Sequence, residues 1–150
     1  MKNWSFEIEK RPNEITEQLE SELGSIGGFV FDRKNQTTFS FRKRILYAWY
    51  IAFQNWTIVK GKLSNDPTEN TTQVNISFRQ HFLVRLILYT HIIFGSVFIL
   101  VLFTTIDEPP TYILGGLIMV LGAIIWTATK KKFKKDAEKY KGLITETLGL

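Results

Sequence analysis

Two long apolar stretches joined by a short polar segment constrain the fold of this chain more than any other feature. Residues 86–106 and 112–129 carry no charged side chain other than the titratable His91. An α-helix rises about 1.5 Å per residue, so about 20 residues cross a hydrocarbon layer of roughly 30 Å. The segment Asp107-Glu108-Pro109-Pro110-Thr111 predicts a tight polar turn, because proline interrupts helices and carboxylates avoid lipid. We therefore expect a transmembrane hairpin over residues 82–129.

A buried helical hairpin in a soluble core is the alternative interpretation. It requires the rest of the chain to cover two apolar helices on every side. The 81 residues before the hairpin are too few for that, so the membrane interpretation is preferred.

Basic residues gather on both sides of the hairpin, whereas the turn between its two stretches carries two acidic residues. Positive residues stay on the cytoplasmic side of a membrane, so we expect an integral membrane protein with both termini in the cytoplasm. The basic residues should form a collar that binds anionic membrane lipids rather than nucleic acid, because they form no broad basic stripe. The collar comprises Arg42, Lys43, Arg44, Arg79, Arg85, Lys130, Lys131, Lys132, Lys134 and Lys135.

Residues 1–81 are predicted to form a cytoplasmic α+β domain. Residues 4–8 alternate between apolar and polar side chains, which is typical of a half-buried strand. Residues 15–23 place apolar side chains at helical spacing, and Asn13 is suited to cap that helix. Residues 29–41 predict a β-hairpin whose phenylalanines share one face.

Two further strands are predicted over residues 56–63 and 71–78, with a turn beginning at Asn65-Asp66-Pro67. Gly61 is expected at a bulge or at a close contact. The apolar residues 45–53 fit either a buried strand or a loop that dips into the membrane interface.

The lysine-rich residues 130–150 predict an amphipathic helix. Apolar side chains recur every three or four residues in this segment, at Phe133, Ala137, Tyr140, Ile144 and Leu148. This stripe is expected to pack back on the sheet and to complete the cytoplasmic domain. The predicted fold class is therefore α+β: a small antiparallel sheet with an N-terminal and a C-terminal helix, interrupted by the transmembrane hairpin.

Aromatic residues are concentrated in the N-terminal domain. They form either the lining of a site for an apolar ligand or simply the core. The set is Trp4, Phe29, Phe31, Phe39, Phe41, Trp49 and Trp56.

Small residues in the hairpin predict close packing between its two helices. Gly95 lies in the first helix, and Gly115, Gly116 and Gly122 lie in the second. His91 is either a hydrogen-bonded or interfacial histidine, or a residue with a proton or ion role.

The sequence contains no recognisable catalytic or cofactor-binding signature. It has no cysteine, no phosphate loop, no HExxH and no dinucleotide fingerprint, and neither of its two histidines has an acidic partner by spacing. We expect no catalytic residues, no metal site and no cofactor, and hence a protein that is not an enzyme.

The segment Trp56-Thr-Ile-Val-Lys-Gly-Lys-Leu63, with Val74-Asn-Ile-Ser-Phe78 after it, resembles small bacterial two-span membrane proteins of uncharacterised role that carry a helix-grip-like α+β domain. The order of elements is also similar to the helix-grip fold of the steroidogenic-acute-regulatory-related lipid-transfer superfamily. In that fold a curved sheet wraps a long final helix around an apolar cavity.

The resemblance implies a membrane-anchored binding module for lipid or a small apolar ligand at the cytoplasmic leaflet of a bacterial cytoplasmic (inner) membrane. An accessory or assembly subunit of a larger membrane complex is the alternative, with a membrane protein or a second copy of the chain as its partner. A transporter would require oligomerisation, because the two helices have no polar lining.

Overall fold

The structure is a computed structural model, and it describes residues 2–25, 28–44, 57–66, 71–105 and 109–150. The chain forms two compact units. The sheet unit contains Met1–His81 and Phe133–Leu150, and the helical unit contains Phe82–Lys132. The ambiguous residues 45–53, including Trp49, and also Trp56, lie outside the described residues.

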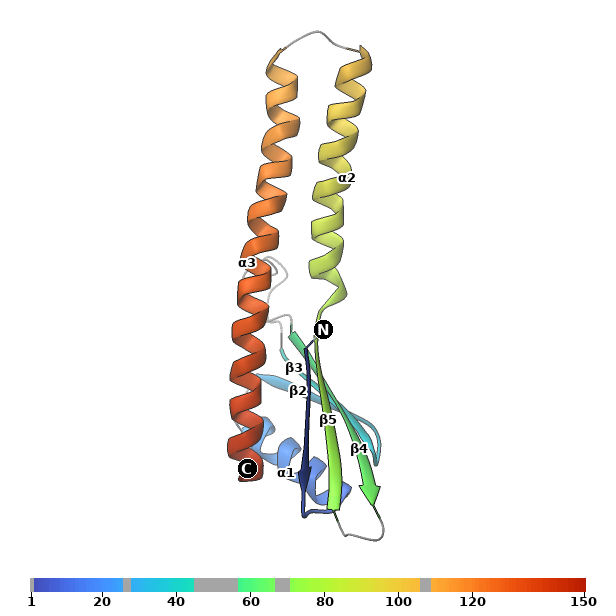
Figure 1. The fold of residues 1–150 in the computed structure, drawn as a ribbon, viewed down its shortest axis with the longest axis vertical. Helices are drawn as coiled ribbons and strands as arrows, with labels where there is room; N and C mark the ends of the chain where they lie inside the picture. Colours follow the sequence, from blue (N-terminus) through green and yellow to red (C-terminus); the bar gives the residue numbers. More distant parts are fainter. Residues whose placement is uncertain (1, 26–27, 45–56, 67–70, 106–108) are drawn as a thin grey trace. The chain divides into compact units, whose positions relative to one another are not determined.

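Five antiparallel strands form one sheet in the order β1-β5-β4-β3-β2 (Figure 1). The strands are β1 (Lys2–Ile8), β2 (Phe29–Asn35), β3 (Thr38–Lys43), β4 (Thr57–Asp66) and β5 (Thr71–Gln80). The first strand pairs with the last, so β1 and β2 form the two edges of the sheet. Together with an N-terminal and a C-terminal helix, the sheet confirms the predicted α+β class.

The core lies between one face of the sheet and two helices, α1 (Pro12–Ser25) and the C-terminal part of α3 (Pro109–Leu148). Alternation along β5 shows how the sheet divides its side chains, because Val74 and Ile76 are buried while Asn75 between them is exposed. Each helix contributes its predicted apolar stripe. The buried helical residues are Ile15, Leu19 and Leu23 of α1 and Ala137, Tyr140, Ile144 and Leu148 of α3.

Helix α1 begins two residues earlier than a helix capped by Asn13 would, and Asn13 is not its cap. Pro12 occupies the first helical position, where its missing N–H costs nothing because that group has no partner within a helix. The backbone N–H of Arg11 instead donates a 3.4 Å hydrogen bond to the carboxylate of Glu14. The Asn13 side chain accepts a 2.8 Å hydrogen bond from Nη2 of Arg33 on the edge strand β2.

The polar turn predicted over residues 107–111 is wrong for residues 109–111, which are helical, while residues 107 and 108 lie outside the described residues. The second apolar stretch and the lysine-rich segment, predicted as separate elements, belong to one helix. Helix α3 begins at Pro109 and continues without a break for 40 residues, to Leu148. Proline is tolerated in the first turn of a helix for the same reason as in α1, so Pro109 and Pro110 start the helix rather than precede it. Gly142 does not interrupt it and has no close packing partner, since a Cβ built there meets nothing within 4 Å.

The turn predicted to begin at Asn65 is also misplaced. Strand β4 extends to Asp66, where Asn65 pairs with Thr72 and Asp66 pairs with Thr71. Polar turn-forming residues remain in the strand because the antiparallel ladder with β5 satisfies their backbone groups.

Helix α2 (Phe82–Thr105) begins four residues before the predicted residue 86 and follows β5 after the single residue His81. The residues added at its start continue the apolar run, and the one charged residue among them, Arg85, is exposed and compatible with a helix. Helices α2 and α3 are both long and apolar enough to cross a membrane.

Candidate functional site

The predicted aromatic face lies in the core of the sheet unit. Phe39 and Phe41 are buried. The rings of Phe31, Phe39 and Phe41 stack on one another, with pairwise centroid distances of 5.6 to 6.4 Å. Tyr140 of α3 is fully buried and meets Phe41 edge-on at 6.0 Å and Phe29 at 5.9 Å. These rings contact one another across the space between sheet and helix, the position that an apolar ligand would need.

Trp4 lies at the margin of that core. It packs against the core cluster, and its ring centroid is 4.5 Å from that of Phe6. Its face carries the ammonium of Lys141 at 4.9 Å from the ring centroid, a cation–π contact that joins β1 to α3.

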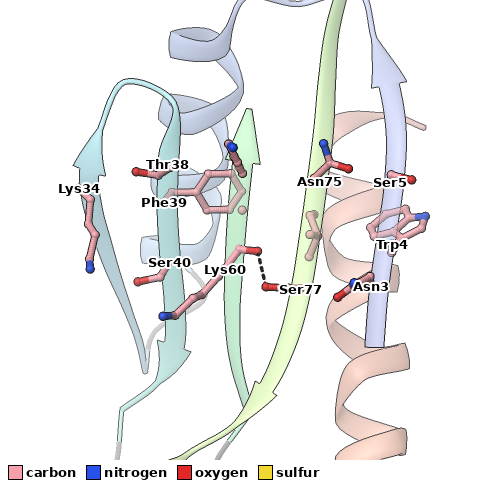
Figure 2. Close-up of a pocket in the computed structure, with 13 residues that line it drawn as sticks. Asn3, Trp4, Ser5, Lys34, Thr38, Phe39, Ser40, Lys60, Asn75 and Ser77 are labelled. Atoms are coloured by element: carbon pink, nitrogen blue, oxygen red, sulfur yellow. Dashed lines mark hydrogen bonds between the residues drawn. The ribbon is translucent and has the colours of Figure 1, made fainter. Parts of the chain in front are cut away.

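The opposite face of the sheet, here called the outer face, is polar and hollowed. Two hollows of about 480 Å³ each lie on it, one toward β1 and one toward β2. They share Lys34, Ser40 and Lys60, one from each of the strands β2, β3 and β4. Figure 2 shows these side chains in front of the sheet, with the ammonium groups of Lys34 and Lys60 ending on either side of the Ser40 hydroxyl.

The strand register explains this arrangement. In one cross-strand row Lys60 stands between Ser40 and Ser77, and in the next row Lys62 stands between Thr38 and Asn75. Each central lysine thus has uncharged hydrogen-bonding neighbours on both sides. The hydroxyl of Ser77 donates a 3.5 Å hydrogen bond to the carbonyl oxygen of Lys60 (Figure 2).

Sequence reasoning missed the outer face as a site. Polar residues alternating with apolar ones along a strand usually indicate solvated positions, and each strand taken alone supports that interpretation. The available signal was that β4 is apolar at alternate positions, which places Lys60 and Lys62 together on its other side. Its significance depends on the register with β3 and β5, which the sequence does not specify.

The predicted basic collar is divided between the two units. Arg42 and Arg79 flank Ile58 in one cross-strand row at the end of the sheet unit's outer face, and both are exposed. Lys43 and Arg44 at the end of β3, and Lys134 and Lys135 of α3, are also exposed in the sheet unit. The remaining members, Arg85, Lys130, Lys131 and Lys132, belong to the helical unit.

His81 lies two residues after Arg79, directly after the end of β5, and ends the first segment of the sheet unit. Burial lowers the pKa of His81 below its ordinary value of 6.5, and the positive charge of Arg42 lowers it further. The unfolded chain therefore takes up this proton at a higher pH than the folded protein. We expect the sheet unit to lose stability as the pH falls from 6.5 through the folded-state pKa.

An NMR titration of the imidazole resonances measures this effect. His81 should titrate below pH 6.5, and Arg42→Gln should move its pKa upward. His81→Gln should flatten the acid side of the stability profile. A His81 pKa at or above 6.5 in the intact protein would contradict the burial argument.

The helical unit exposes apolar side chains around most of both helices. Only 11% of the apolar window of each helix is buried. Side chains such as Phe94, Leu100, Leu117 and Val120 are between 54 and 65% exposed. A core helix of a soluble protein would be mostly buried, so these surfaces suit a lipid or an apolar protein environment.

Glycines bring the two helices of this unit together. A Cβ built on Gly95 would meet Met119 at 2.6 Å, one on Gly115 would meet Ile99 at 2.9 Å, and one on Gly122 would lie 3.2 Å from His91. Gly116 is different, because nothing lies within 4 Å of its Cβ position.

His91 is satisfied within its own helix. Its Nδ1 lies 2.8 Å from the carbonyl oxygen of Ile87, one helical turn earlier, so that nitrogen donates when it carries the proton. Among the described residues, no three histidine, aspartate or glutamate side chains are grouped to hold a metal ion.

Comparison of the chain with protein-family models, with curated proteins and with solved structures finds no match in any of the three.

Proposed function

We propose that the protein is a membrane-anchored, non-enzymatic binding module of a bacterial inner membrane. The observation that carries this proposal is the pairing of a compact sheet unit with two helices that expose apolar side chains almost all round. Two such helices in a bilayer would hold the sheet unit beside the membrane surface. Basic residues on both sides of the hairpin favour a cytoplasmic position for the sheet unit and both termini.

The outer face of the sheet is the binding surface in this proposal. The aromatic residues that were candidates for an apolar ligand site contact one another and Tyr140, which disfavours a ligand between the sheet and α3. The two hollows lie on the polar side of the sheet instead. The resemblance to helix-grip proteins supports a binding role through the order of elements, a sheet followed by a long final helix.

Native mass spectrometry of the protein, extracted from its own membrane in mild detergent, tests this function. We expect a small polar ligand or a lipid retained at close to one per chain. Replacing Lys60 and Lys62 by alanine should reduce that occupancy, whereas alanine at the exposed Lys139 of α3, away from the sheet, should leave it unchanged. A protein that never carries a ligand, at any detergent concentration, would contradict the binding function.

An accessory subunit is the second candidate, and the exposed apolar surface of α2 and α3 favours it. In that case the same measurement would show a larger complex that survives extraction. Substituting Leu117, which is 54% exposed, by tryptophan should then release the partner without unfolding the sheet unit.

A further inference from the structure

We propose that the outer face of the sheet binds a phosphate ester, with the phosphate held between the ammonium groups of Lys34 and Lys60 above the hydroxyl of Ser40. This inference rests on the proposed function, in which the sheet unit is a binding module, and it names the class of ligand.

The position is defined by three neighbouring strands. Ser40 on β3 pairs with Lys60 on β4, and Lys34 lies on β2, on the other side of β3. All three residues line both hollows, so they mark the place where the two hollows meet. Both lysines are exposed, and their side chains approach this place from opposite sides (Figure 2).

The donors at this place suit a tetrahedral anion. Each ammonium offers three N–H groups as a point charge, and the hydroxyl of Ser40 offers one more donor from below. Phosphate presents oxygens in several directions and accepts such separate bonds, whereas a carboxylate is best matched by the planar fork of an arginine. Adjacent strands are about 4.8 Å apart, so side chains two strands apart can reach one phosphate between them.

The wall of the hollow toward β1 indicates what carries the phosphate. Hydroxyl and amide groups line this hollow on both sides of β4, and each can both donate and accept a hydrogen bond. They belong to Thr38, Ser77, Asn75, Asn3 and Ser5. This lining is suited to a hydroxyl-bearing group, so the ligand class is a phosphorylated polyol. Such a ligand can be a soluble ester or the headgroup of an anionic lipid.

One carboxylate opposes this assignment and supplies a test of it. Asp32 pairs with Ser40 across the edge of the sheet and lines the hollow toward β2. Its charge repels a phosphate at the proposed position. Removing that charge should therefore strengthen binding, a change opposite in sign to the loss of either lysine.

Amine acetylation followed by peptide mass spectrometry measures occupancy at each lysine of the full chain in phosphatidylcholine nanodiscs. We expect sn-glycerol 3-phosphate to slow the acetylation of Lys34 and Lys60 while Lys139 reacts as before. Lys60→Ala should raise the concentration needed to protect Lys34 by about tenfold, as expected for losing a charged hydrogen bond. Asp32→Asn should lower it by roughly twofold to threefold.

A second arm distinguishes the two sources of the phosphate. Protection that appears only in nanodiscs containing phosphatidylglycerol supports the site and assigns the phosphate to a lipid headgroup. Protection by the soluble ester in phosphatidylcholine nanodiscs supports the site and assigns it to a soluble ligand.

Absence of protection in both arms would overturn the phosphate assignment, as would protection that Lys60→Ala and Asp32→Asn leave unchanged. Protection by an acidic peptide alone would likewise overturn it, in favour of a protein partner. If native mass spectrometry still shows a phosphate-free ligand in any of these cases, the binding function stands and only the ligand class fails.

Discussion

Replacing Tyr140 by alanine is expected to lower the free energy of unfolding of the sheet unit by about 3–5 kcal/mol. Among the described residues, Tyr140 is the largest fully buried side chain, and it has no exposed surface. Its ring joins α3 to Phe41 of β3 and to Phe29 of β2. The truncation removes these contacts and leaves a cavity between the helix and the sheet, which the surrounding structure fills only in part.

Hydrogen exchange of the backbone amides of β3, β4 and β5 measures this loss in the full chain, because the sheet unit can be followed separately from the helices. Lys139→Ala is the matched control, since it alters the adjacent exposed position of the same helix and should change stability by less than about 0.5 kcal/mol. A loss below about 1 kcal/mol for Tyr140→Ala would show that α3 does not close the core.

Gly61→Ala is expected to destabilise the sheet by about 1–3 kcal/mol. Gly61 pairs directly with Phe39, and the buried ring of Phe39 occupies the space where a Cβ on Gly61 would lie. Relief requires the ring to move, and the ring packs against those of Phe31 and Phe41. The alanine therefore overpacks the core instead of filling open space.

Two variants separate this clash from a general effect of replacing glycine. Gly142→Ala, in open space on α3, should stabilise the helix by up to about 1 kcal/mol. Combining Gly61→Ala with Phe39→Leu should cost less stability than the sum of the two single changes. The smaller leucine leaves room for the added methyl group, and the methyl group fills part of the space that the ring vacates. Strict additivity of the free energies of unfolding would contradict the proposed contact between the ring and Gly61.

Side-chain periodicity was sufficient to predict most of the core. Burial on one face imposes the helical spacing of Ile15, Leu19 and Leu23 and the alternation in β5. Both patterns can therefore be recognised in the sequence without a structure. The close approach expected at Gly61 is confirmed for a similar reason. Glycine inside a strand weakens it, and its presence indicates that a neighbour needs the space.

The continuity of α3 was not predictable from the same patterns. Hydropathy changes sharply at Lys130, which suggests a boundary, but lysine, alanine and glutamate are good helix formers and nothing there breaks the backbone. The outer face was missed for a different reason. Its residues are ordinary solvated types, and only the cross-strand register brings Lys34, Ser40 and Lys60 to one place.

The function follows from two surfaces with different chemistry. In the proposed function, the apolar surfaces of α2 and α3 supply attachment to the membrane, and the polar outer face of the sheet supplies recognition. Neither proposed role requires a catalytic constellation, and the core of the sheet unit is occupied by its own aromatic side chains. Membrane insertion of the helical unit is the central claim, since the proposed role of every other element depends on it.

Labelling of single cysteines in intact membranes tests that claim most directly, and the chain is suited to it because it contains no cysteine of its own. Val120→Cys lies at a position that is 56% exposed in the protein alone, and Glu22→Cys lies at an exposed position of the sheet unit. In opened membranes, a membrane-impermeant maleimide should label the cysteine at position 22 and leave that at position 120 unmodified until detergent and denaturant are added. Rapid labelling at position 120 in intact membranes, or recovery of the protein in the soluble fraction, would contradict the account.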